Sequence, residues 1–165
     1  MTFSIHDASA PVLARSLRNL SAVLDKALAT GVDEKTFLEA RLAPDMHPFP
    51  RQIQMASDAA KGAVARLAGV EVPAMPDTET TFAELKDRLE RTIAFIDSVD
   101  AAKFEGAEDR EVLLKFPQGE MRFTGRDFLT SFALPNFFFH ATMVYALLRA
   151  NGVPLGKMDF LGGGR

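Results

Sequence analysis

Length, composition and charge already limit what this protein can be. A chain of 165 residues, 47% of them apolar and 25% charged, can bury a hydrophobic core, and we expect one domain over residues 1–165. The net charge of -3, with acidic and basic residues interspersed, disfavours nucleic acid and anionic membranes as partners, and the absence of cysteine excludes disulfides and thiolate zinc sites. Neither a signal peptide nor a membrane span of roughly 20 apolar residues is apparent, so we expect a cytoplasmic protein.

The first predicted helix covers residues 12–28. Its leucines recur three and four residues apart, which is the spacing of one buried stripe, and Gly31 offers a left-handed stop. The stripe consists of Leu13, Leu17, Leu20, Leu24 and Leu28. A shorter helical fragment is expected within residues 33–42, with Asp33 at its cap, before a proline-rich segment at residues 43–50.

Two further helices are predicted before residue 100. Helix two begins at Pro48 or Pro50, because proline is tolerated in a first helical turn. Its buried stripe comprises Ile53, Ala56, Ala60, Val64 and Leu67. Helix three begins after the capping box at residues 81–84 and ends near Val99.

The apolar period changes after residue 110. Two short apolar runs, at residues 112–116 and 121–124, flank a proline-glycine turn and predict a small β-hairpin. A last helix is expected from residue 125 to residue 150, ended by Asn151 and the glycine after it and interrupted by Pro135. Its many phenylalanines predict that it is the most buried element.

Together these elements predict an all-α four-helix bundle with a small hairpin before the last helix. Residues 153–165 are expected to form an irregular tail that Phe160 and Leu161 dock on the bundle. The three phenylalanines at positions 137–139 face three directions of a helix, so they favour a core or a subunit interface over a substrate box. We expect a homodimer to cover the outward rings.

The histidines are the best candidates for chemistry, because a chain without cysteine must build a transition-metal site from imidazole and carboxylate. His47 stands at the start of helix two. His140 follows Asn136 by four residues in the last helix, so the two side chains share one face and can point at one atom. This pair is a candidate half-site.

This arrangement resembles the DinB/YfiT-like superfamily of bacterial four-helix proteins, many of which are regarded as metalloenzymes. More closely, the chain is similar to an uncharacterised, domain-of-unknown-function branch of that superfamily. The segments that carry the resemblance are LAPDMHP at 42–48, RQIQ at 51–54, AKGA at 60–63, LPNFFFH at 134–140 and NGVPLGK at 151–157. The likeness implies a helical bundle over nearly the whole chain.

The resemblance also implies a divalent metal, such as zinc or nickel, held between the helices. Superfamily members use a histidine at the start of helix two, which His47 matches, and a His-x3-His pair in the last helix. His140 matches the second histidine of that pair, and Asn136 replaces the first. An amide oxygen is a weaker ligand than an imidazole, so the site would bind metal loosely, and Asp45 is a possible additional ligand.

Arg51 and Gln54 are the candidates for a substrate cleft. Arg51 would oppose a bound cation if it pointed at the site, but it would suit an anionic substrate.

Each of the metal-site residues also has a structural alternative. His47 could cap backbone groups, Asn136 could satisfy polar groups freed by the Pro135 kink, and His140 could be a neutral, hydrogen-bonded core imidazole.

Two functions remain as alternatives. The first is a divalent-metal-dependent enzyme acting on a small molecule, and wider relatives that are thiol transferases point to thiol chemistry. The second is a non-catalytic, dimeric small-molecule-binding or stress-related protein with an eroded metal site. Neither a catalytic residue nor a substrate is predicted by the sequence.

Overall fold

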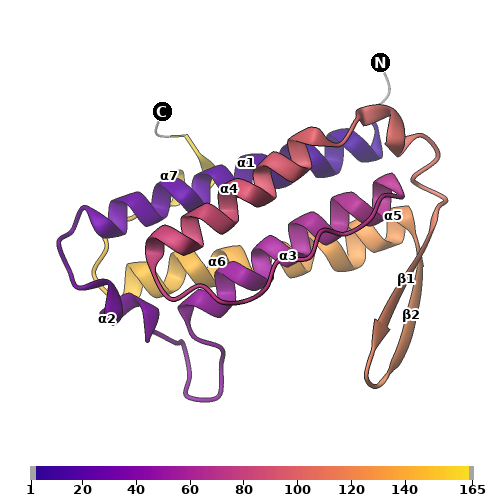
Figure 1. Ribbon diagram of the computed structural model, residues 1–165. Helices are drawn as coiled ribbons and strands as arrows, with labels where there is room; N and C mark the ends of the chain where they lie inside the picture. The colour runs from indigo at the N-terminus through magenta and orange to yellow at the C-terminus, as the bar shows by residue number, and fades with distance from the viewer. Residues whose placement is uncertain (1–2, 164–165) are drawn as a thin grey trace.

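The computed structural model describes residues 3–163, which form four long helices packed side by side and a β-hairpin that projects from one end of the bundle (Figure 1). The long helices are α1 (Ile5–Leu28), α3 (Phe49–Ala68), α4 (Phe82–Ser98) and α6 (Leu134–Ala150). Helix α3 packs against α4 and α6, and α1 packs against the same two helices from the other side. The predicted helical bundle with a small hairpin is therefore confirmed.

Helix α1 begins about two turns earlier than predicted. Ser4 and Asp7 form a capping box there, which satisfies backbone N–H groups that would otherwise lack partners. Pro11 lies inside the helix and does not end it. The leucine stripe is buried as predicted except at its end, where Leu28 is exposed.

The next helices begin and end close to the predicted positions. The short α2 (Glu34–Leu38) is capped by Asp33, and α3 starts at Phe49 with Pro50 in its first turn. The predicted stripe of α3 is completely buried. Thr81 and Glu84 form the capping box of α4.

The hairpin is also present. After a short 3-10 turn, η1 (Ala101–Phe104), the antiparallel strands β1 (Glu111–Phe116) and β2 (Gly119–Thr124) pair along their whole length. Val112 and Leu114 alternate along β1 and are buried, so one face of this strand packs on the bundle.

The last helical segment differs from the prediction, because Pro135 does not break it. It consists of α5 (Gly125–Asp127), a π-helical stretch, η2 (Phe128–Ala133), and then α6. The N–H of Leu134 bonds the carbonyl of Leu129, five residues back. Since proline has no N–H to donate, the wider π turns just before Pro135 let the helix continue.

Helix α6 is less completely buried than expected. Phe137 is fully buried, but Phe139 is 53% exposed. Contrary to the sequence-based expectation, one helical segment of the described chain, Gly125–Ala150, is long and apolar enough by length and composition to cross a membrane. The core helix of a water-soluble protein passes the same test, and this segment contributes its buried residues to the core between α1 and α3.

The tail after α6 is more ordered than predicted. Lys157–Leu161 form a short helix, α7, which packs against α1 and is held there by Lys26, 2.5 Å from Asp159. Phe160 packs against the bundle as expected, whereas Leu161 is exposed, so its predicted docking role is wrong. Residues 164–165 of the predicted tail lie outside the described residues.

Candidate functional site

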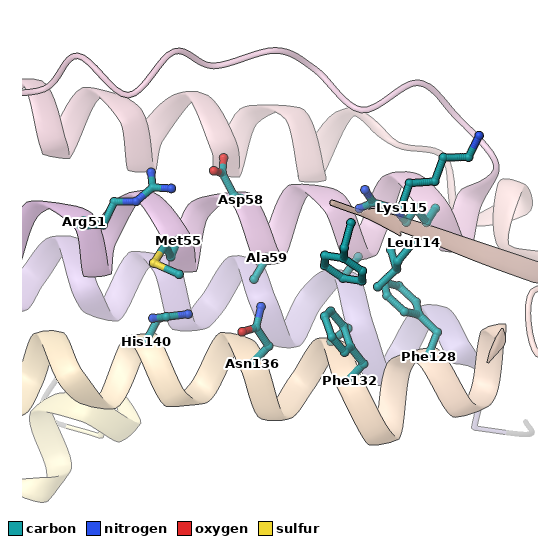
Figure 2. A pocket seen from close by; sticks show the side chains of 14 residues that line it. Arg51, Met55, Asp58, Ala59, Leu114, Lys115, Phe128, Phe132, Asn136 and His140 are labelled. Carbon is teal, nitrogen blue, oxygen red and sulfur yellow. The ribbon is translucent and has the colours of Figure 1, made fainter. Parts of the chain in front are cut away.

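A cavity of about 330 Å³ lies between α3 and the last helical segment, with β1 at one end (Figure 2). The α3 side chains that line it recur at helical spacing from Arg51 to Arg66, so one stripe of α3 forms one wall. Phe132, Asn136 and His140 form the facing wall. A cavity of this size is large enough for a small organic ligand.

His140 is the most constrained polar group in this wall. Its side chain is buried, and its Nδ1 lies 2.8 Å from Oε1 of Gln52. The Gln52 Nε2 donates to the carbonyl of His47 at 3.1 Å, so the Gln52 oxygen is the atom turned to the imidazole. Nδ1 therefore carries the proton, and Nε2 keeps a free lone pair that can accept a hydrogen bond from a ligand.

The surroundings of His140 keep its imidazole neutral. Burial lowers the pKa of His140 below its ordinary value of 6.5, and the charges of His47 and Arg51 lower it further. At neutral pH this side chain is therefore an acceptor at Nε2 and a donor at Nδ1, in agreement with the hydrogen bond to Gln52.

Asn136 lies one turn before His140 and lines the same cavity, as their spacing predicts (Figure 2). Within residues 3–163 its amide makes no hydrogen bond to another residue. The alternative role, satisfying backbone groups near Pro135, is therefore wrong. The amide is instead available to a molecule in the cavity, as both donor and acceptor.

The other predicted metal ligands do not join this pair. His47 and Asp45 are both exposed and neither lines the cavity. In the described part of the chain no group of three or more His, Cys, Asp or Glu side chains is placed to hold a metal ion. One imidazole and one amide are fewer than the three protein ligands of a catalytic zinc site, so the donors as placed do not fit such a centre, and the metal site stays a prediction.

Of the two residues predicted to line a substrate cleft, only Arg51 lines the cavity. Arg51 lines the cavity and forms an ion pair with Asp77. Gln54 is buried outside the cavity, where it accepts a hydrogen bond from Arg51 at 3.3 Å and donates one to Glu79 at 3.0 Å. Arg51 is thus part of the cleft, whereas Gln54 lies outside the cleft and helps to position Arg51 through their hydrogen bond.

A buried ionic cluster that the sequence did not predict lies behind the cavity, centred on Arg88 of α4. Its side chain is 0% exposed, and its guanidinium lies 2.8 Å from Asp58, 3.0 Å from Asp77 and 3.0 Å from Glu79. Asp58 is also 2.8 Å from Lys61 and lines the cavity. The cluster joins α3, α4 and the loop between them, and it holds Asp58 in place at the cavity wall.

Glu79 depends on this cluster to remain charged. Burial by itself raises the pKa of Glu79, but hydrogen bonds from its own backbone, Arg88 and Gln54, together with the charge of Arg88, outweigh burial and lower the pKa overall. Its ionised carboxylate is therefore part of the folded structure at neutral pH.

The fold defines a class of protein. A bundle of four long helices with a small hairpin before the last helix is the architecture of a DinB-like protein. Residues 5–161 match the family described as Domain of unknown function (DUF1993), and the chain belongs to this family. The predicted DinB-like branch of unknown function is therefore confirmed.

A solved structure gives the same result. The chain is similar to the crystal structure of a DinB family member protein from Shewanella denitrificans, with 38% sequence identity and a TM-score of 0.88. The similarity covers 96% of this chain and 92% of that one. Nothing among the curated proteins matches the chain.

Proposed function

We propose that this protein binds a small molecule in the cleft between α3 and α6, with His140 and Asn136 as its polar contacts. The observation that carries the proposal is the orientation of His140. Its Nδ1–H is held by Gln52, so Nε2 is unused beside an Asn136 amide that has no partner among the described residues. Polar groups with unused hydrogen-bonding capacity in a mainly apolar cavity are typical of ligand sites.

The lining residues indicate what such a ligand looks like. Met55, Ala59 and Phe132 supply apolar surface between the polar groups of the cleft. A matching molecule carries an apolar or aromatic portion and a hydroxyl or amide that donates to Nε2 of His140 and exchanges hydrogen bonds with Asn136.

The test uses probes of this shape. Phenylacetamide and benzyl alcohol are titrated into isotope-labelled protein, and the ring signals of His140 and the side-chain amide signals of Asn136 are followed by NMR. We expect saturable shifts at both residues. In Ala59→Phe the new ring fills the cleft and abolishes them, whereas Ala83→Phe, an exposed site on α4, leaves them unchanged. If neither these probes nor phenylacetate and phenyl phosphate shift the signals, or if Ala59→Phe binds as the wild type does, the proposal is wrong.

A metal-dependent enzyme is the second candidate function, and the Gln52 contact also favours it. Metal-binding histidines commonly donate their second ring N–H to an oxygen acceptor, as His140 does. Elemental analysis and titration with zinc and nickel test this reading. Stoichiometric metal that is lost in both His47→Ala and His140→Ala would support it. Metal binding that survives His140→Ala, or no tight binding at all, would contradict it.

A further inference from the structure

Arg66 is a cation in the cleft whose guanidinium has no partner among the described residues. It lies in the last turn of α3, fifteen residues after Arg51, and it lines the cavity about 22 Å further along the helix at 1.5 Å per residue. Figure 2 shows His140 near Arg51 at one end of the cavity and Phe128 with Leu114 at the other. Within residues 3–163, no hydrogen bond or ion pair engages the guanidinium of Arg66.

Arg66 is exceptional among the charges of the cavity. Each of the other charged side chains that line it already has an oppositely charged partner. These pairs are Arg51–Asp77, Asp58–Arg88 and Lys115–Glu120. None of these carboxylates is paired with Arg66, so the cavity has one positive charge that the described chain does not neutralise.

Gly62 makes room for this guanidinium. It is a buried residue one turn before Arg66 in α3, and a Cβ at Gly62 would collide with Nη1 of Arg66. The Arg66 side chain therefore folds back along α3 and over the glycine. Glycine in the interior of a helix is destabilising relative to alanine, and the space that it leaves for the guanidinium accounts for its presence here.

The position of Arg66 is unfavourable without a counter-ion. The residue is half-buried, and this burial lowers the pKa of its guanidinium, although an arginine stays charged at neutral pH. A charge that is partly removed from water and left unpaired costs free energy, which a bound anion would recover.

We infer that Arg66 forms an anion subsite at the hairpin end of the cleft, so that the bound molecule is an organic acid with an apolar or aromatic group. This inference rests on the proposed function and adds the charge of the ligand. The rings of Phe128 and Phe132, whose centroids are 6.1 Å apart, line the same end of the cavity and would face the apolar group. The anion is a carboxylate or a phosphate, both of which a guanidinium binds through two parallel hydrogen bonds.

Three probes that share a phenyl ring test the inference. Phenylacetate, phenyl phosphate and phenylacetamide are titrated into the wild-type protein at low salt, and their dissociation constants are compared by NMR. We expect at least one anion to bind about tenfold or more tightly than the neutral amide, because charge-assisted hydrogen bonds are about twice as strong as neutral ones. The tighter of the two anions tells whether the subsite takes carboxylate or phosphate.

Substitutions then assign the preference to Arg66. Arg66→Met keeps much of the side-chain volume and should abolish the preference, whereas Arg15→Met, an exposed arginine on α1, changes the net charge equally and should leave it intact. Gly62→Ala retains every charge but displaces the guanidinium, so it should weaken anion binding without weakening phenylacetamide binding. Circular dichroism confirms that each variant is folded, and Gly62→Ala remains a test if Arg66→Met is not.

The possible failures can be told apart. Equal affinity of wild type for the anions and for phenylacetamide, or a preference that survives both Arg66→Met and Gly62→Ala, would overturn the anion subsite and leave the proposed cleft binding intact. Failure of all three probes to bind would overturn the subsite and the proposed function together.

Discussion

Removal of the Arg88 charge tests how much the buried ionic cluster behind the cleft contributes to stability. In Arg88→Met a flexible apolar side chain replaces the fully buried guanidinium. Asp58 still has Lys61 and Asp77 still has Arg51, so these two carboxylates keep a partner. Glu79, with a side chain only 4% exposed, keeps the hydrogen bonds from its own backbone and from Gln54, and a guanidinium 3.8 Å away on the exposed Arg91.

The loss of stability depends on Glu79, whose buried negative charge would lose its main partner, Arg88. Breaking a buried ion pair by removing one partner costs about 3–5 kcal/mol, and a chain of this length loses about 2–4 °C in Tm per kcal/mol. We expect Arg88→Met to lower the free energy of unfolding by about 3–5 kcal/mol and the Tm by roughly 6–20 °C. Urea unfolding at pH 7, followed by circular dichroism at 222 nm, measures the first quantity, and thermal unfolding measures the second.

Two comparisons make the result specific. The double variant Arg88→Met with Glu79→Gln has no stranded charge, so it should be more stable than Arg88→Met alone. Lys35→Met breaks an exposed pair with Glu39 and should cost less than about 1 kcal/mol. A loss below about 1 kcal/mol in Arg88→Met, or a double variant no more stable than the single one, would refute the assignment of this cost to Glu79.

Acid unfolding gives an independent view of the same carboxylate. Because the folded pKa of Glu79 is lowered from its ordinary value of 4.5, its ionised form contributes stability that is fully present above pH 4.5 and is lost as the pH falls through the folded pKa. Wild type should therefore lose stability below pH 4.5, and Glu79→Gln should lose less over that range.

The remaining predictions concern the cleft and the outer face of α6. Since the pKa of His140 is lowered from 6.5, its contribution to stability is present above pH 6.5 and decreases below it. NMR titration should give His140 a pKa below 6.5, and this pKa should rise in His47→Ala because a nearby positive charge is removed. An unchanged pKa in His47→Ala would contradict the electrostatic coupling. Gln52→Leu leaves Nδ1–H of His140 without an acceptor and should cost about 1–3 kcal/mol in thermal unfolding. An effect below about 0.5 kcal/mol would show that this contact is dispensable. The predicted homodimer would cover the exposed ring of Phe139, so sedimentation velocity should show a dimer that Phe139→Glu dissociates, and a wild-type monomer would contradict it.

Local patterns in the sequence predicted most of the fold. The stripe of α3, the capping box of α4 and the hairpin all depend on residues within a few positions of each other, and these elements begin and end near the expected places. The π turns before Pro135 were not predicted, because their hydrogen bonds depend on how the helix packs. The sequence predicted that some of the rings at positions 137–139 face outward but, for the same reason, not that Phe139 is the exposed one.

The candidate site was predictable only in part. The spacing of four between Asn136 and His140 placed both in one cleft, because that separation fixes a shared helical face. Their environment depends on tertiary contacts, and the acceptor for His140 is Gln52, 88 residues away in sequence. The metal role of His47 came from the family resemblance alone, and its exposed position leaves that role untested.

One signal for the buried cluster was present in the sequence. Arg88 lies between Leu85 and Leu89 on the apolar stripe of α4, where a charge must be paired if the helix packs as its pattern predicts. Its acidic partners Asp77 and Glu79 lie in a loop with no regular pattern, so the sequence could not identify them.

The π-helical stretch Phe128–Ala133 has a consequence for how this family can vary. A π turn accommodates one residue more than an α turn, and each residue of an α-helix turns the chain by about 100°. Deleting one residue there would restore regular α-helix and leave the hairpin at nearly the same angle relative to His140, whereas deleting one residue from α6 itself would rotate it by about 100°. Only the deletion in α6 would turn the strand that ends the cavity towards another side of the bundle, so the π-helical stretch is where this segment can lose a residue and still keep the cleft closed.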